Sequence, residues 1–399
     1  MFKVYVEWDQ GIGKKQSDDG GEQYYALSGT AHTFQLHARA PGGKFTLQAY
    51  FDGVATPNNP QGSILDLGWH HDGNTIFILS GTEGHFSSVH PPSSWMQSNI
   101  STLGPRPIRH LCMPGSHDAG MSILDGKTAF ATPGNTQTQT ISIANQLLLG
   151  SRYFDLRPVI ASGQYKTGHY SNLDVVGWQG ANGQSIAQII DQLNAFTTSN
   201  HELIVLNLSH AYNTDVGRSY RSFNQDEWTG LFRQMSAIQH LFASTSGDLT
   251  TLPLNQFIGD GQAAVVVVVQ PDSSIPNFTF GPYANKGFYP YSAFNVYNNY
   301  SGDDKVSDMS KDQLGKMRTQ RTSPDAQTFL LSWTLTQAAS DIIGGISILD
   351  LANMANPAIF TELPPALSKA TYPNILYVDN FNSSDITALA MAVNDIVNQ

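Results

Sequence analysis

Short apolar segments that end in ionisable residues recur along this chain and constrain its fold more than any other feature. Three of them, with their polar ends, are 111–118 with His117 and Asp118, 152–157 with Asp155 and Arg157, and 374–379 with Asp379. In a parallel barrel the carboxyl ends of all strands open on one face, where catalytic groups gather. The pattern therefore predicts a barrel with an acid–base site at one end.

From about residue 100, strand-like segments alternate with longer helical segments, as in repeated βα units. The predicted strands are 108–113, 152–157, 165–169, 203–208, 263–269, 289–294, 328–335 and 374–379. Helices are expected over 141–149, 185–197, 226–241 and 384–397. Eight strands of this kind predict an α/β fold of the (β/α)8, or TIM-barrel, type.

The first ninety or so residues carry a different, all-β pattern. Val4, Val6 and Trp8 alternate on one face of a strand, and glycine-rich turns separate several further short strands. We expect a small sandwich-like accessory domain over 1–92, a linker over 93–99 and a catalytic domain over 100–399. A carbohydrate- or membrane-binding role is the default expectation for the accessory domain.

Composition excludes some functions. The formal net charge is −11 and no basic stripe is visible, which argues against a nucleic-acid partner and against electrostatic attachment to anionic lipid. The single cysteine, Cys112, lies in an apolar segment and is expected to be buried. No signal peptide is visible, and the longest apolar run, 263–269, is too short to span a bilayer. We expect a soluble monomer, cytoplasmic or secreted without a recognisable leader, and peripheral to membranes.

Five sequence pieces occur in the order found in one enzyme family. They are Met-Pro-Gly-Ser-His-Asp (113–118), Arg-Tyr-Phe-Asp-Leu-Arg (152–157), Gly-His (168–169), Leu-Leu-Ser-Trp-Thr-Leu-Thr-Gln (330–337) and the strand that ends in Asp379. Over roughly residues 100–399 the chain resembles the X-domain of phosphatidylinositol-specific phospholipase C, bacterial and fungal metal-independent type. The resemblance implies a distorted, incomplete barrel that acts on a phospholipid or inositol phosphodiester at a transient membrane interface.

The resemblance also implies roles for the polar residues. His117 would be the general base, oriented by Asp379, and His169 the general acid, oriented by Asp118. Calcium-dependent relatives neutralise the phosphate with a metal, whereas here Arg157, beside Asp155, would supply the positive charge. We therefore expect neither a metal nor a cofactor. The expected products are diacylglycerol and a cyclic inositol phosphate.

The expected headgroup contacts depart from the family pattern. His210 stands near the place of a lysine, and Gln270 where bacterial members have an arginine. Asn295 and Tyr297 are aligned with an Asp-x-Tyr pair that grips inositol, and Trp333 completes the predicted substrate-binding set. Substrate identity is therefore less certain than reaction type.

Two alternatives remain open. One is a barrel enzyme like sphingomyelinase D or a glycerophosphodiesterase. Such enzymes need a carboxylate cluster for magnesium near the first histidine, and Arg157 argues against it. The other is a catalytically weak lipid- or carbohydrate-binding protein, which the altered inositol contacts favour and the complete catalytic set opposes.

Overall fold

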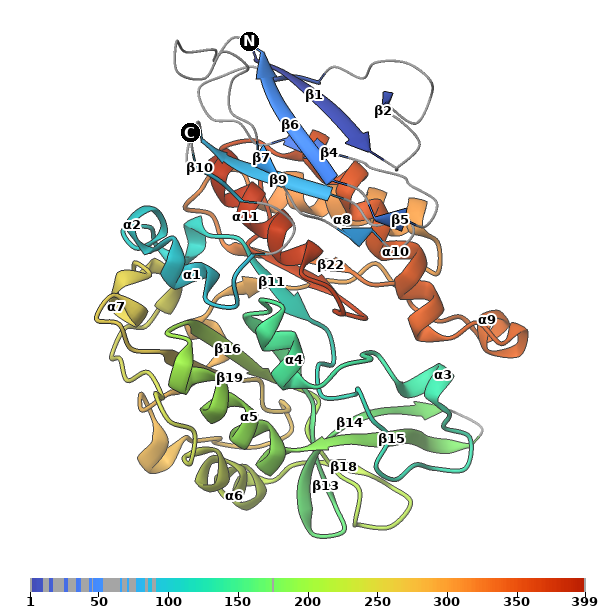
Figure 1. Cartoon of the computed structure of the whole chain (residues 1–399). Helices are drawn as coiled ribbons and strands as arrows, with labels where there is room; N and C mark the ends of the chain where they lie inside the picture. Colours follow the sequence, from blue (N-terminus) through green and yellow to red (C-terminus); the bar gives the residue numbers. More distant parts are fainter. Residues whose placement is uncertain are drawn as a thin grey trace.

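The centre of the protein is a curled sheet of eight parallel strands (Figure 1). The computed structural model describes residues 91–173 and 176–397, and within residues 1–90 only the backbone of ten short strands. The strand order is β20-β19-β16-β12-β11-β23-β22-β21. In chain order these strands are β11 (Met113–Ser116), β12 (Tyr153–Leu156), β16 (Leu203–Leu208), β19 (Ala264–Val269), β20 (Phe288–Pro290), β21 (Val296–Tyr297), β22 (Thr328–Trp333) and β23 (Ile375–Val378). Strands β20 and β21 form the two edges, so the barrel is open between them. The predicted distorted TIM-type barrel is confirmed.

Side chains alternate between the barrel interior and an outer layer, as the two-residue period of a strand requires. On β23, Ile375 and Tyr377 belong to the interior cluster, while Leu376 and Val378 belong to an outer one. By the same alternation, Leu330 of β22 belongs to the interior cluster. Residues that continue the inward set past the end of a strand therefore reach the barrel mouth.

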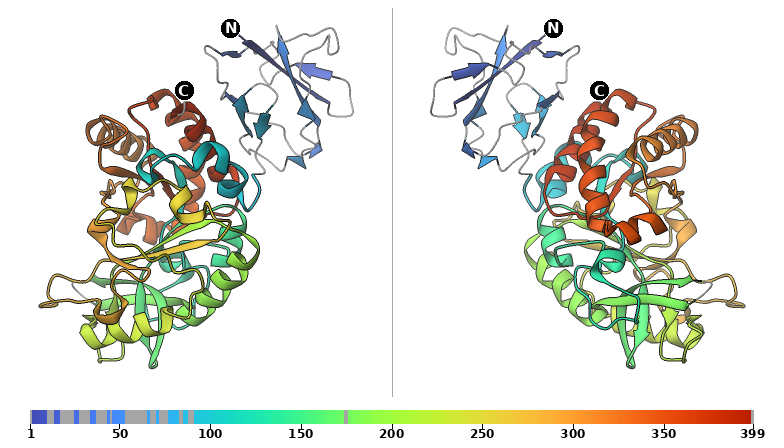
Figure 2. Two further views of the ribbon diagram at one scale, coloured as in Figure 1. Left: turned by 90° about the vertical axis from the view of Figure 1, so that its left-hand side faces the viewer. Right: turned by 90° about the vertical axis from the view of Figure 1, so that its right-hand side faces the viewer.

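Helices cover the outer face of the sheet on two sides (Figures 1 and 2). One group is α4 (Ile143–Leu148), α5 (Ile186–Ser199) and α6 (Gln225–Met235), and the other is α8 (Val306–Gln320), α10 (Ile348–Glu362) and α11 (Asp385–Val397). Side-chain capping boxes begin α5 at Ser185, α6 at Asn224 and α10 at Ser347, which satisfies the first amide groups of each helix. The sequence did not predict α8, α10 or the short α9 (Ala339–Gly344).

A second, five-stranded sheet extends from the carboxyl end of the barrel. Its strands are β13 (Pro158–Ala161), β14 (Gln164–Leu173), β15 (Gly177–Ser185), β17 (Tyr212–Asn213) and β18 (Arg221–Ser222). β13 directly continues the chain of β12, and β17 follows closely on β16. The predicted strand 165–169 is therefore not a barrel strand but part of β14, and the short β21 takes the eighth place. The prediction failed because a strand that leaves the barrel has the same kind of sequence pattern as a strand within it.

One further prediction needs correction, and the predicted linker gains detail. Residues 108–110 form a 3-10 turn, η1 (Ile108–His110), and β11 begins only at Met113. The expected linker over 93–99 contains α1 (Trp95–Ser98), which α2 (Ile100–Leu103) follows. Trp95 is buried, and its indole N–H donates to the Gly150 carbonyl at 3.0 Å. Burial of this large apolar side chain attaches the segment to the barrel.

The described backbone before residue 91 consists of strands. They are β1 (Phe2–Asp9), β2 (Lys14–Gln16), β3 (Tyr25–Leu27), β4 (Phe34–Leu36), β5 (Gly43–Lys44), β6 (Thr46–Asp52), β7 (Leu65–Asp66), β8 (His70–His71), β9 (Phe77–Thr82) and β10 (His85–Ser87). The sandwich architecture and the domain boundary stay predictions. In the part of the chain that is described, Cys112 is fully buried as expected, and no helix has the length and apolar character needed to cross a bilayer.

Candidate active site

Neighbouring strands β11 and β23 place His117 and Asp379 side by side. His117 Nδ1 lies 2.7 Å from Asp379 Oδ1, and the carboxylate is almost fully buried. Burial alone would lower the pKa of His117, but the charge of Asp379 and its hydrogen bond outweigh burial and raise it above the ordinary 6.5. A proton held on Nδ1 by Asp379 leaves the lone pair of Nε2 directed into the site.

Arg157, just beyond β12, connects the polar groups of the site. Its Nη2 lies 2.6 Å from His117 Nε2, and its Nε donates to Asp155 Oδ2 at 3.2 Å. Its Nη1 is 3.5 Å from Asp118 Oδ2. Burial opposes the charged form, yet Asp118 and Asp155 raise the pKa of Arg157 above its ordinary value. The guanidinium is therefore a fixed positive charge at the barrel mouth.

Asp155 holds this arrangement in place. Besides Arg157, its carboxylate accepts from the Ser209 hydroxyl at 3.1 Å, the Tyr377 hydroxyl at 2.8 Å and the Asp118 amide at 3.2 Å. Burial would raise the pKa of Asp155, but the charges of Arg157 and His117 and the hydrogen bond from Tyr377 lower it to about 2. The carboxylate thus stays ionised and orients the arginine.

A second histidine–aspartate pair joins β14 to the turn after β11. His169 Nδ1 lies 3.1 Å from Asp118 Oδ2. Asp118 is fully buried and has a φ of +39°, so the chain turns sharply here and its side chain diverges from that of His117. Neither carboxylate oxygen of Asp118 makes an aligned hydrogen bond within the described chain. The six residues expected to be catalytic thus lie together, although His169 comes from the second sheet rather than from a barrel strand.

Two of the predicted headgroup residues lie at the same end of the barrel. His210 follows β16, and its Nδ1 lies 2.9 Å from the Ser209 hydroxyl. Gln270 follows β19 and donates from Nε2 to Asn207 Oδ1 at 2.9 Å. Desolvation, and then the charge of Arg157, lower the pKa of His210. His210 is therefore neutral at pH 7 and does not replace the charge of a lysine.

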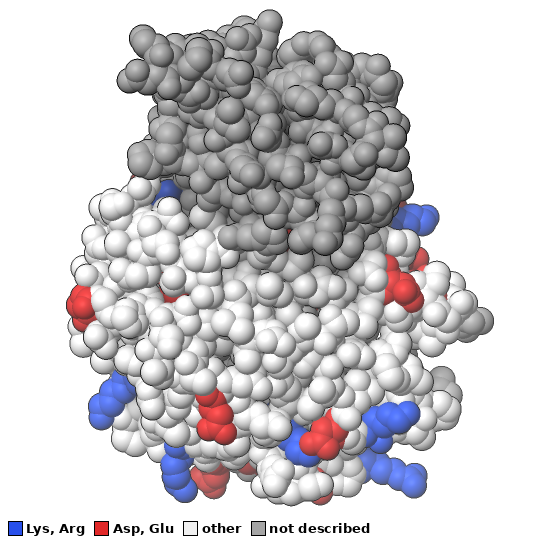
Figure 3. Space-filling model, in the orientation of Figure 1, with Lys and Arg blue, Asp and Glu red and all other residues white. Residues whose placement is uncertain are grey.

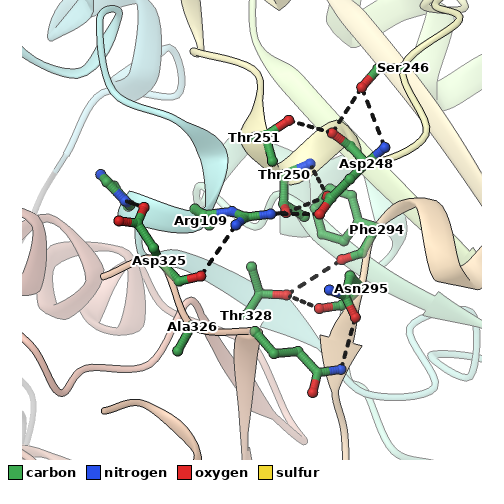
Figure 4. Close-up of polar contacts among 12 residues, drawn as sticks. Arg109, Ser246, Asp248, Thr250, Thr251, Phe294, Asn295, Asp325, Ala326 and Thr328 are labelled. Carbon is green, nitrogen blue, oxygen red and sulfur yellow. Dashed lines mark hydrogen bonds and ion pairs between the residues drawn. The ribbon is translucent and has the colours of Figure 1, made fainter. Parts of the chain in front are cut away.

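The other three predicted headgroup residues are elsewhere. Asn295 precedes β21 and lies at the amino-terminal end of the barrel, where its carbonyl accepts from the Thr328 hydroxyl at 2.7 Å. Figure 4 shows Asn295 and Thr328 beside the polar contacts of Arg109 and Asp248. Tyr297 stacks on Phe329 in the outer layer, with ring centroids 5.6 Å apart.

Trp333 is fully buried in the same outer layer and donates its indole N–H to the Ala355 carbonyl of α10 at 2.8 Å. The corrections for Tyr297 and Trp333 have one physical cause, because a shift of one residue along a strand moves a side chain to the opposite face.

The structure also identifies residues that the sequence reasoning missed. Val296 belongs to the interior cluster, and Asn298 and Tyr300 follow in the connection beyond the carboxyl end of β21. Both are exposed, Tyr300 by 62%. Tyr377 is inward-facing on β23, two residues before Asp379, and its ring meets that of His117 edge-on at 5.2 Å. The two-residue period in the printed sequence could have indicated Tyr377, which lies two residues before Asp379.

The site can perform acid–base chemistry on an anionic group. It offers a histidine whose Nε2 faces Arg157, a second histidine paired with a carboxylate, and an arginine whose two terminal nitrogens each face one of these pairs. Within the described residues, no group of three or more His, Cys, Asp or Glu side chains is arranged to hold a metal ion. A planar guanidinium between two proton-transfer groups is suited to a phosphate diester.

The barrel fold is similar to that of solved structures of phosphatidylinositol-specific phospholipase C. The enzyme of Staphylococcus aureus aligns with a TM-score of 0.55 and 16% identity, over 76% of this chain and 98% of that chain. The enzyme of Listeria monocytogenes gives 0.53 and 16%, over 75% and 98%. At these identities the likeness shows the fold.

Sequence comparisons point the same way. A PI-PLC X-box domain-containing protein of Dictyostelium discoideum is 28% identical over 134 residues, which cover 30% of this chain and 17% of the relative. The variant-surface-glycoprotein phospholipase C of Trypanosoma cruzi is 27% identical over 205 residues, 44% of this chain and 49% of the relative. The chain thus matches half or less of the length of these relatives, and no family model matches it. The resemblance inferred from the motifs is confirmed.

Proposed function

We propose that the protein is a phosphodiesterase that cleaves phosphatidylinositol-type phospholipids to diacylglycerol and a cyclic inositol phosphate. One observation carries the proposal: Arg157 lies between two histidine–aspartate pairs, with Nη2 bonded to His117 and Nη1 directed at Asp118. A phosphodiester needs one group to remove a proton, one to donate a proton and a cation for the phosphoryl oxygens. The three side chains supply these functions.

In the proposed first step, His117 removes the proton from the inositol 2-hydroxyl. Asp379 fixes the proton of the neutral ring on Nδ1 and stabilises the imidazolium that forms when Nε2 accepts the second proton. The hydroxyl oxygen then attacks phosphorus and closes the cyclic phosphate. Arg157 must turn from His117 Nε2 to the phosphoryl oxygens when substrate binds, and its bond to Asp155 guides this movement.

His169 protonates the departing diacylglycerol oxygen as the bond to phosphorus breaks. Buried Asp118 supports the positive charge on His169 and, having no aligned hydrogen bond, is free to shift towards the imidazolium. Proton transfer by each histidine is expected to contribute on the order of 10²- to 10⁴-fold. Charge stabilisation by Arg157 contributes about 3 kcal/mol or more.

Exposed apolar side chains around the site support action at a lipid surface. Eight of the ten large hydrophobic residues that are exposed in the described chain lie in connections beyond strand carboxyl ends, or in the β14–β15 hairpin. These eight are Ile123, Phe130, Leu173, Val176, Val216, Tyr300, Ile342 and Ile346. On the face shown in Figure 3, charged side chains of both signs are scattered rather than gathered in a basic patch. We infer that membrane contact is apolar and only weakly dependent on salt.

Headgroup recognition follows from the mouth residues. Asn298 and Tyr300 are the proposed inositol contacts from β21, together with His210 and Gln270. None of the four carries a formal positive charge at pH 7, so a further phosphate on inositol finds no cation among them. The expected substrate is unphosphorylated phosphatidylinositol or a similar neutral headgroup.

The decisive experiment measures cleavage of a soluble aryl ester of myo-inositol 1-phosphate in the presence of EDTA. Phosphorus NMR should show the cyclic phosphate before any acyclic product. His117→Ala should lose activity, while the matched His110→Ala, which removes a histidine paired with Asp325 at the far end of the barrel, should retain it.

Turnover restored only by magnesium or calcium would instead support a metal-dependent barrel phosphodiesterase. Binding of inositol without turnover would support a catalytically weak binding protein.

A further inference from the structure

A cavity of about 290 Å³ lies outside the barrel wall, between α10 and the loop that joins β23 to α11. Four asparagines, Asn353, Asn356, Asn380 and Asn382, are among its lining residues. It lies behind the active site, because Asn356 Nδ2 donates to the Asp379 carbonyl at 2.8 Å while the Asp379 carboxylate turns to His117. None of its lining residues belongs to the catalytic set.

The cavity borders hydrogen-bond acceptors that lack donors. Asn356 Oδ1 is buried and makes no hydrogen bond within the described chain. Pro357, inside α10, has no N–H, so the carbonyl of Asn353 loses its usual helical donor. A buried acceptor such as Asn356 Oδ1 is costly unless something donates to it, whereas Asn353 is exposed and its carbonyl is open to a donor from the cavity side. A bound molecule with hydroxyl groups would satisfy both.

Charge and shape narrow the class of ligand. Among the described lining residues none is Lys, Arg or His, so an anion finds no charged partner. The single ionisable one, Asp385, already accepts from the Ser383 hydroxyl at 2.9 Å, which disfavours a cation. Phe360, Phe381 and Ile386 supply an apolar wall. Amide groups beside aromatic rings fit a molecule with both hydroxyls and an apolar C–H face.

We propose that this cavity binds a neutral sugar. The sugar hydroxyls donate to Asn356 Oδ1 and to the Asn353 carbonyl, and they exchange hydrogen bonds with the exposed amide of Asn382. The apolar face of the ring packs on Phe360 and Phe381. The cavity lies at the carboxyl end of β23, so it can reach either a free sugar or one carried by a lipid beside the active site.

The test is direct binding, measured by saturation-transfer NMR and calorimetry with methyl mannoside, methyl galactoside and N-acetylglucosamine. We expect at least one to bind the wild-type protein. Asn382→Trp, which fills the cavity from an exposed position, should weaken binding by about ten-fold or more, and so should Asn356→Leu. The matched control Asn145→Trp, at an exposed asparagine on α4, should bind like wild type. Melting temperatures check that each variant is folded.

Three results would overturn the proposal: no binding of any of the three sugars, equal binding by Asn382→Trp, or displacement of the sugar by inorganic phosphate or tetramethylammonium. Phosphatidylcholine vesicles with and without galactosyl diacylglycerol identify the source. Preferential binding to the glycolipid vesicles indicates a lipid-linked sugar, and equal binding a free one; either supports the site. Binding that persists in His117→Ala keeps this inference separate from the proposed catalysis.

Discussion

The substitution Asp379→Asn tests how the site prepares its base. In the structure, the almost fully buried Asp379 carboxylate lies 2.7 Å from His117 Nδ1 and raises the pKa of that histidine. A hydrogen bond to a charged group is worth about 1.5–3 kcal/mol. This bond is strongest when His117 is protonated, as in the transition state, so its loss should lower kcat by about 10- to 150-fold.

The direction in which the pH profile of kcat/KM moves is a second test of this substitution. Catalysis needs neutral His117, so kcat/KM should rise with pH through the pKa of this histidine, which lies above the ordinary 6.5. Asp379→Asn removes the charge that raises the pKa, and the positive Arg157 remains to lower it. The acidic limb of the profile should therefore move to lower pH while the maximum rate falls. Stopped assays with the soluble substrate across pH 4–9 or so measure both quantities.

A matched control is Asp325→Asn. Asp325 pairs with His110 at 2.8 Å, the same kind of contact, but at the opposite end of the barrel. It should leave the pH profile unchanged. An acidic limb that stays in place in Asp379→Asn, or moves to higher pH, would refute the assignment of His117 as the base.

Three further predictions concern the same site. A substrate with a better leaving group should rescue His169→Ala much more than His117→Ala, since only the acid becomes dispensable; equal rescue would reverse or remove the assigned roles. EDTA should leave wild-type hydrolysis unchanged, whereas Arg157→Asp should lower kcat by about 10²-fold or more. Loss of wild-type activity in EDTA that calcium restores would contradict this. Asn295→Asp should leave KM unchanged because this residue lies at the far end of the barrel, whereas Tyr300→Ala should raise KM about two- to ten-fold, the range for one lost hydrogen bond. If KM changes in Asn295→Asp but not in Tyr300→Ala, the headgroup site has been assigned to the wrong end of the barrel.

Local sequence determined the barrel and the residue types of its candidate site. Apolar runs such as 203–208 and 264–269 are typical of buried parallel strands. Both strands begin and end within one residue of their predicted bounds. Polar residues directly after such runs lie at the strand carboxyl ends, because a buried strand is mostly apolar. For this reason His117, Arg157 and Asp379 could be predicted from the chain alone.

Tertiary structure decided which face each side chain occupies and which sheet each strand joins. Asn295 and Tyr297 matched the family motif in residue order. The parallel pairing of Val296 with Thr328, however, places Asn295 at the amino-terminal end of the barrel and Tyr297 outside it. His169 reaches Asp118 only because β13 to β15 form a separate sheet at the carboxyl end of the barrel. Strand register and sheet membership depend on contacts between residues distant in sequence, and a single residue of shift reverses them. Local pattern fixes what a segment can bury, whereas the pairing of segments fixes what it faces.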